Sequence, residues 1–441
     1  MTTDDLLETA QRPDTGKPRT SLRPLLLRLH FYAGILVGPF LLVAAISGLL
    51  YIFAPQLEQV VNDHQLHVPA GVGTVPLADQ VSRAETAVPE GTLRSIRPGT
   101  TATDTTQVIF TAPGLPESFY RTAFVNPYDG EIRGVLDTYG SGQAMPVRGW
   151  LDNLHRNLHL GDFGRVYSEL AASWLWVVVA GGLVLWWGRR RRRGATSGRA
   201  RTLTWHATTG TWVALVLLFL SATGLTWSQF AGQNISELRS TLSWETPSVT
   251  STLPAPAAAA PPQSLDAVLA TARSAGLGGP VEITPATTET AFVVKQVERP
   301  WPHRQDAVSI DPRTGAIVDV LRFGDWPLAA KLASWGIDAH MGLLFGLPNQ
   351  IVLALVMIGL IALIIWGYRM WWQRRPTGRA VGRPFARGSL RRLPMKVLVP
   401  LVAAGIVIGW FLPVFGLSLL AFLLLDAFLA WRADRVTRTA A

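Results

Sequence analysis

Long apolar runs separated by two polar regions dominate the hydropathy pattern of this 441-residue chain. The predominantly apolar runs are residues 30–53, 170–188, 206–228 and 351–372, with a tighter apolar pair at 395–431 that is broken by Pro413. A helix of about 20 apolar residues is long enough to cross the roughly 30 Å hydrocarbon core of a bilayer. The pattern therefore predicts a polytopic α-helical membrane protein with six spans. The last two would form a hairpin that either crosses fully or is re-entrant.

The polar regions 54–169 and 229–350 carry short alternating segments that are typical of β-strands. The strands expected in the first region are Leu93–Ile96, Thr106–Thr111, Phe119–Val125 and Glu131–Leu136. Those expected in the second are Val281–Thr284, Ala291–Val297, Ala307–Asp311 and Ala316–Leu321. A Pro/Ala-rich linker at 254–262 precedes a helix at Ser264–Ser274, for which Ser264 is a suitable N-cap. We expect a small α+β module in each region.

The net charge of +10 is distributed as a membrane topology signal. Of the 40 basic residues, 24 lie in the N-terminus, Arg189–Arg201, Arg369–Lys396 and the C-terminal tail. By the positive-inside rule, the segments 1–29, 189–205, 373–394 and 432–441 are expected on the cytoplasmic side of the inner membrane, and both polar modules on the exterior. Contacts of the basic segments with anionic lipid are expected, and nucleic-acid binding is not.

The chain contains no cysteine. This excludes cysteine-ligated iron–sulfur clusters, haem attached through C-x-x-C-H, thiol redox chemistry and disulfides. A redox cofactor would therefore need other ligands, of which histidine is the obvious candidate.

Four motifs occur twice in the same order, which predicts a duplicated unit of one spanning helix, one exterior α+β module and a second spanning helix. The first copy of the set comprises His30-x3-Gly34-x13-Gly48, Asn126–Gly130, His159-Leu160-Gly161 and Trp187-Gly188-Arg189. The second comprises His206-x3-Gly210-x13-Gly224, Asp311–Gly315, His340-Met341-Gly342 and Trp366-Gly367-Tyr368-Arg369. Ionisable side chains in or near membrane spans are costly unless they have a function, so the repeated histidines are the best indication of chemistry.

This ordered set of motifs resembles the PepSY-associated transmembrane proteins found around bacterial iron uptake, and the resemblance covers nearly the whole chain. It implies PepSY-like exterior modules and an inner-membrane haem protein that reduces ferric siderophores at the outer face. Some relatives carry a flavin-binding reductase domain, and nothing in this sequence matches one.

The predicted topology places His30 and His206 at the cytoplasmic ends of their spans and His159 and His340 on the exterior side. Parallel repeats would bring each pair face to face, and two neutral imidazoles can supply both axial ligands of a haem iron. We therefore expect two b-type haems, one near each side. The alternative for each histidine is anchoring at the membrane interface.

Several further residues are candidates for the same sites. Gly34 and Gly210 could let a porphyrin lie against the backbone, or serve close packing between helices. His155 and His159 form an H-x3-H pair on one helix face, a spacing that also suits zinc. Because Gly336 replaces it in the second copy, His155 is expected to contact a propionate or substrate, or to be an ordinary surface residue.

Trp205 and Trp335 adjoin proposed ligands and could pack on porphyrin, whereas the alternative for both is an interfacial aromatic belt. His303, beside Pro302, is expected to be exposed.

The function expected from these observations is electron transfer from a cytoplasmic donor or quinol, through two haems, to an exterior ferric siderophore. Two other classes are alternatives: a non-enzymatic sensor or peptidase-regulating membrane protein, and a permease subunit. The spans hold almost no mid-membrane polar residues of the kind a permease needs, and a sensor has no need of paired histidines.

Overall fold

The computed structural model describes residues 23–188, 198–253, 263–374 and 393–439, and four of its helices are long and apolar enough to cross a membrane. These are α1 (Arg23–Ile52), α6 (Gly161–Trp187), α7 (Gly198–Leu225) and α11 (Leu347–Trp372). They occupy the four long apolar runs of the sequence. The predicted hairpin consists of α12 (Met395–Phe411) and α13 (Pro413–Thr439), whose apolar stretches are shorter. The basic residues Arg189–Arg193 and the Pro/Ala-rich linker lie outside the described residues.

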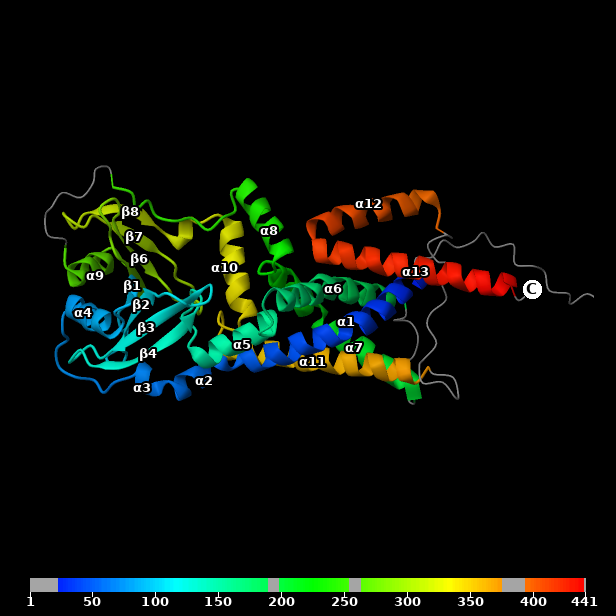
Figure 1. Ribbon diagram of the computed structural model, residues 1–441, viewed down its shortest axis with the longest axis horizontal. Coiled ribbons are helices and arrows are strands. Elements are labelled where there is room, and N and C mark those ends of the chain that lie inside the picture. The colour runs from blue at the N-terminus through cyan, green and yellow to red at the C-terminus, as the bar shows by residue number, and fades with distance from the viewer. Residues whose placement is uncertain (1–22, 189–197, 254–262, 375–392, 440–441) are drawn as a thin grey trace, which may run out of the picture.

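The four long helices pack as a bundle around an apolar core (Figure 1), in which α1 and α7 each contact both α6 and α11. The hairpin packs on the outside of this bundle. There the indole nitrogen of Trp174 on α6 donates a 2.8 Å hydrogen bond to the hydroxyl of Ser418 on α13. Arg28 of α1 also forms an ion pair with Asp426 of α13. A buried guanidinium in a membrane bundle requires such a partner.

The two polar regions form a single eight-stranded antiparallel sheet rather than two separate modules. The strands of the first region are β1 (Thr92–Arg97), β2 (Thr106–Thr111), β3 (Phe119–Val125) and β4 (Ile132–Tyr139). Those of the second are β5 (Val281–Thr284), β6 (Phe292–Gln296), β7 (Ala307–Ile310) and β8 (Ile317–Leu321). The sheet order is β4-β3-β2-β1-β5-β6-β7-β8, and β1 meets β5 at Ile96 and Ile283. Pairing β1 with β5 covers an edge that each half-sheet would otherwise leave open.

Two amphipathic helices pack against this sheet and complete its core. They are α4 (Leu77–Ala87) and α9 (Leu265–Ser274), whose buried side chains join those of the strands in one apolar cluster. The N-cap expected at Ser264 is confirmed, because its hydroxyl oxygen accepts a hydrogen bond from the backbone N–H of Ala267 at 3.2 Å.

Several shorter elements connect the sheet to the bundle, as Figure 1 shows for α5 and α10. They are α2 (Ala54–Val61), α3 (Asp63–Leu66), α5 (Pro146–Asn157), α8 (Phe230–Thr241), the 3₁₀ turn η1 (Phe323–Asp325) and α10 (Leu328–His340). We call the end of the bundle that meets these elements the sheet end, and the opposite end, where α1 and α7 begin, the distal end. Because α5 and α10 enter the sheet end, residues far apart in the sequence meet there.

An ion pair crosses the junction between the half-sheets, where Glu282 of β5 meets Arg97 of β1 at 2.7 Å; Glu282 also pairs with Lys295 of β6 at 2.9 Å. Burial alone would raise the pKa of Glu282, but the charges of Arg97 and Lys295 hold this pKa below its usual value. Because the carboxylate is favoured in the folded state, its stabilisation is present above the unfolded pKa and is lost as the pH falls through the folded pKa.

We expect Glu282→Gln to destabilise the β1–β5 junction by roughly 1–3 kcal/mol at neutral pH, since the largely buried guanidinium of Arg97 loses its charged acceptor. Hydrogen exchange of β1 and β5 amides should be faster in the variant, and this difference should shrink as the pH falls through the lowered pKa of Glu282, where the unaltered side chain is itself protonated. Glu289→Gln, an exposed change on the same module, is the control. Unchanged β1 and β5 exchange in Glu282→Gln would show that the ion pair does not hold the junction.

Candidate functional site: two histidine-lined cavities

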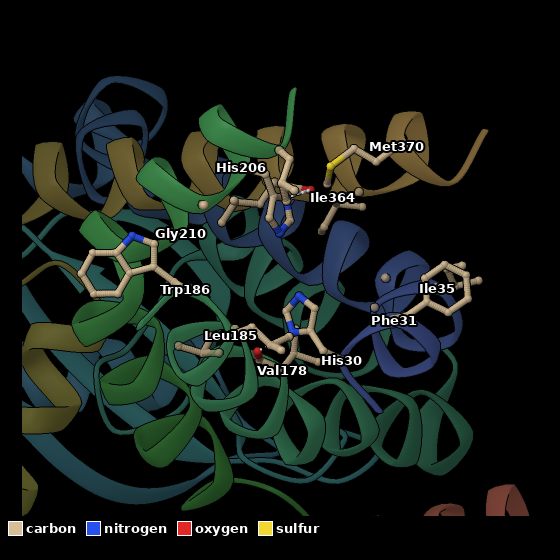
Figure 2. Close-up of a pocket in the computed structure, with 18 of the residues that line it drawn as sticks. His30, Phe31, Ile35, Val178, Leu185, Trp186, His206, Gly210, Ile364 and Met370 are labelled. Carbon is tan, nitrogen blue, oxygen red and sulfur yellow. Dashed lines mark hydrogen bonds between the residues drawn. The ribbon is translucent and has the colours of Figure 1, made fainter. Parts of the chain in front are cut away.

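His30 of α1 and His206 of α7 face each other across a cavity near the distal end of the bundle. Figure 2 shows both rings pointing into this space, and their centroids are 6.2 Å apart with ring planes at 83°. The cavity, which we call the distal cavity, has a volume of about 270 Å³ and is lined by α1, α6, α7 and α11. The structure thus brings together the first pair of histidines that the sequence predicts.

Backbone carbonyls on the neighbouring helices orient these two rings. Nδ1 of His30 donates to the carbonyl oxygen of Val178 at 2.9 Å, and Nδ1 of His206 donates to that of Leu363 at 3.1 Å. A carbonyl can only accept, so the proton of each neutral ring lies on Nδ1. The lone pair is then on Nε2, the atom of each ring that remains available for a metal.

The wall of the distal cavity combines an apolar surface with guanidinium groups. Gly34 and Gly210 both line it, and a Cβ added at Gly34 would meet no atom within 4 Å, so its backbone borders open space. The basic lining residues are Arg23, Arg199 and Arg374. An apolar slot with two imidazoles and several cations suits a flat, hydrophobic group that carries carboxylates.

A second cavity of about 480 Å³ lies at the sheet end, and we call it the sheet-side cavity. Its histidines are His155 of α5 and His340 of α10. Nδ1 of His155 donates to the hydroxyl oxygen of Ser47 at 3.0 Å, and Nδ1 of His340 donates to that of Thr223 at 2.6 Å.

The second hydrogen bond of each hydroxyl group shows that the imidazole is the donor and the hydroxyl oxygen the acceptor. The hydroxyl of Ser47 donates to the carbonyl of Val43, and that of Thr223 to the carbonyl of Phe219, each at 2.8 Å, so each oxygen is left to accept from an imidazole. Burial lowers the pKa of His155, and burial together with the charge of His155 lowers the pKa of His340 to about 3. Both rings are therefore neutral, with Nε2 free to bind a metal.

The predicted pairing of His159 with His340 is wrong, and His155 takes the place expected for His159. Helix α5 ends at Asn157, and His159 lies beyond it at φ 55°. There its exposed ring stacks on Trp150 with a centroid separation of 4.9 Å and hydrogen-bonds the Trp150 carbonyl. Helix α10, in contrast, continues to His340 itself. His155 and His159 consequently do not share a helix face, as the zinc alternative would require.

A second shared motif could have identified the correct residue. Trp150 precedes His155 with the same spacing as Trp335 precedes His340, which gives Trp-x4-His in both halves. The Leu/Met-Gly residues that follow His159 and His340 align His159 with His340, one helical turn away from the alignment of His155 with His340 that the structure shows. The pattern H-x3-G-x13-G also contained a clue, because its second glycines, Gly48 and Gly224, line the sheet-side cavity.

Three other predicted residues lie elsewhere. Trp205 packs against Trp366 at 5.9 Å, and Trp335 against Trp301 at 5.8 Å, and neither lines the two cavities. His303 is buried rather than exposed.

The burial of His303 is explained by its polar neighbours. Its Nδ1 lies 3.2 Å from a carboxylate oxygen of Asp338, and its Nε2 lies 3.0 Å from the hydroxyl of Ser334. These contacts join the loop after β6 to α10, which a local sequence pattern does not reveal.

Four buried leucines line both cavities and lie between them. They are Leu41, Leu175, Leu217 and Leu360, one from each long helix, and we call them the leucine septum. The stretch of α1 from His30 to Ser47 rises roughly 25 Å, so the two histidine pairs lie at different depths of the bundle. The septum separates them with side chains that neither bind water nor titrate.

These features define a multi-pass membrane protein. Its four-helix bundle holds a histidine pair at each of two depths and is joined to an extramembrane sheet. The chain belongs to the family described as the PepSY-associated TM region, whose model matches residues 27–374. No curated protein matches the chain significantly.

Proposed function

We propose that the protein is a di-haem b oxidoreductase that passes electrons through the membrane to a ferric siderophore and releases Fe²⁺ for uptake. The observation that carries the proposal is the arrangement of four neutral histidines as two pairs, each with Nε2 left free by a hydrogen bond at Nδ1. Each pair could supply two imidazole nitrogens to a haem iron, and the haem would then be held by histidine alone.

The geometry of the distal pair supports this assignment. An imidazole nitrogen binds a metal at roughly 2 Å and half a ring adds about 1 Å, so two rings on one metal have centroids about 6 Å apart. The 6.2 Å between His30 and His206 meets this requirement without movement of the helices. Arg23, Arg199 and Arg374 would neutralise the propionates.

Matching contacts in the two halves support the proposed duplication. The carbonyl of Val178 accepts from Nδ1 of His30, and the carbonyl of Leu363 accepts from Nδ1 of His206 in the same way. The hydroxyls of Ser47 and Thr223 likewise accept from Nδ1 of His155 and of His340, respectively. A duplication would carry each ligand together with the group that orients it, so both cavities would keep the same donor chemistry.

The protein's own residues would control the reaction rather than perform it. Haem supplies reversible one-electron transfer when bound. Val178, Leu363, Ser47 and Thr223 fix the ring orientations, while the leucine septum keeps water from connecting the two cavities. Each electron that reaches the substrate converts Fe³⁺ to Fe²⁺, for which a cage of hard oxygen ligands built for Fe³⁺ is less suited.

The direction of transfer follows from the proposed topology in the inner membrane. The positive-inside rule places the distal cavity on the cytoplasmic side and the sheet outside. A cytoplasmic donor or quinol would then deliver electrons at His30 and His206, and the ferric chelate would accept them near His155 and His340. A separate cytoplasmic reductase or quinol is the donor that we propose.

Purified protein in sealed vesicles tests this function. With a quinol supplied and ferric siderophore outside, a membrane-impermeable Fe²⁺ indicator outside should develop colour only when protein is present. Movement of intact ferric chelate into the vesicles without Fe²⁺ would indicate a permease instead. If neither Fe²⁺ formation nor transport is detected, the result would favour a sensor and would rule out the reductase.

A further inference from the structure

The sheet-side cavity has a polar compartment that the distal cavity lacks. Its polar lining includes Tyr139, Arg148, Asp152, Arg156, Arg165 and Arg299, which we call the arginine mouth. The cavity volume is about 480 Å³, compared with about 270 Å³ at the distal end. Since each cavity offers one histidine pair, the same cofactor does not account for the additional space.

Two donors in this mouth are without acceptors. Arg148 uses its terminal nitrogens on Glu58 (2.7 Å) and the Gly142 carbonyl (3.2 Å), but its Nε is buried with no hydrogen-bond partner among the described residues. Within the same described part of the chain, Arg165 has no ion pair or hydrogen bond. A buried guanidinium N–H without an acceptor and a neighbouring arginine without a protein partner, both at described residues that line a cavity, suit a ligand rich in acceptor oxygens.

The carboxylates around the mouth are already engaged. Both oxygens of Glu169 accept backbone N–H groups at the start of α8, at 2.9 Å each. Behind the wall, Glu58 pairs with Arg148 and Asp338 pairs with Arg299. Burial raises the pKa of Asp152, while Arg156, Arg148 and a hydrogen bond from Tyr139 oppose that rise. Among the described residues, Arg165 and the Nε of Arg148 therefore remain the donors best able to meet an incoming ligand.

The arginines of the mouth come mainly from one half of the chain. When His155 is aligned with His340, the second half of the chain has no arginine at the equivalent positions. Ala333, Met341 and Gln350 stand there in place of Arg148, Arg156 and Arg165. In the distal cavity, by contrast, Arg23 and Arg199 hold equivalent positions before His30 and His206.

A cofactor held by equivalent groups of both halves suits the symmetric pair of the distal cavity. Guanidinium groups supplied mostly by one half suit a second, different ligand.

We propose that the arginine mouth is the binding subsite for the ferric chelate and selects chelates whose periphery carries carboxylate or other anionic oxygens. The subsite rests on the proposed function and deepens it by naming the substrate class. Guanidinium groups bind such oxygens through charge-assisted, often bidentate hydrogen bonds. A chelate held there would lie in the cavity that contains His155 and His340, next to the site of electron delivery.

Binding of redox-inert gallium(III) chelates to the oxidised, haem-loaded protein tests the proposal without relying on turnover. Anionic gallium citrate should bind about tenfold more weakly to Arg165→Gln than to the unaltered protein, as expected for one lost charged hydrogen bond. Cationic gallium desferrioxamine B should bind more weakly to the unaltered protein and respond little to the change. Arg156→Gln should act in the same direction as Arg165→Gln. Arg94→Gln, an exposed change on β1, is the matched control.

The haem content and spectrum separate the possible outcomes. Two haems in Arg165→Gln together with weaker citrate binding support the subsite. Lost haem or a shifted midpoint potential with unchanged citrate binding would assign the mouth to propionates and overturn the proposal, as would unchanged binding in both arginine variants. A protein without haem would contradict the proposed function itself, a result that the spectrum reveals before any chelate is added.

Discussion

Replacing His206 by alanine is expected to remove one of two haems from the purified protein and to leave the other in place. His206 provides one of the two nitrogens of the distal cavity, and its ring is 6.2 Å from that of His30. The leucine septum separates this cavity from the sheet-side pair, so the loss should not spread. The haem content should fall from about two to about one per chain, because His30 alone would supply only one of the two imidazole nitrogens proposed to hold that haem.

The matched control for this change is His64→Ala. His64 is exposed on the extramembrane part, where its Nδ1 is hydrogen-bonded to Arg133, and it lines neither cavity. The control should keep both haems. Retention of both haems by His206→Ala would show that the distal pair does not hold one, and loss of both would show that the two sites are not independent.

The second large loss of haem and of activity is expected when His155, and not His159, is replaced by alanine. His155→Ala removes a nitrogen that borders the sheet-side cavity, so the haem of that cavity should be lost and reduction of the external ferric chelate should fall to background. The haem that we propose for His30 and His206 should remain and should still be reduced by quinol. Haem content and the rate of Fe²⁺ release, measured on the same preparation, check both expectations.

His159→Ala is the control that the chain itself provides, since the two histidines are close in sequence and only His155 lines the cavity. Loss of the exposed His159 ring removes a stacking contact with Trp150 and should leave two haems. The reverse result, with haem lost in His159→Ala and kept in His155→Ala, would restore the pairing expected from the repeated His-Leu/Met-Gly motif.

The parts of the fold that were predictable depend on local periodicity. The four long spans follow from apolar runs, and the strands β2, β3 and β5 lie at the positions that their alternation predicts. The union of β1 with β5 was not predictable, because edge pairing is decided by contacts between residues far apart in the chain.

The candidate site shows the same division between local and non-local information. His30 and His206 were identified because each begins a span with its own glycine one turn later. His159 was misassigned because the sequence does not specify where α5 ends, and one helical turn at that end separates a cavity-facing ring from an exposed one. Arg299 lines the sheet-side cavity and pairs with Asp338, a contact between distant residues that no spacing rule anticipates.

The most direct measurement of the central proposal is the reduced-minus-oxidised absorption spectrum of the purified protein, combined with the haem-to-chain ratio. The expected result is a b-type haem spectrum with two haems per chain, reducible in full by quinol or dithionite. A preparation that is correctly folded but shows no haem bands would contradict the proposal.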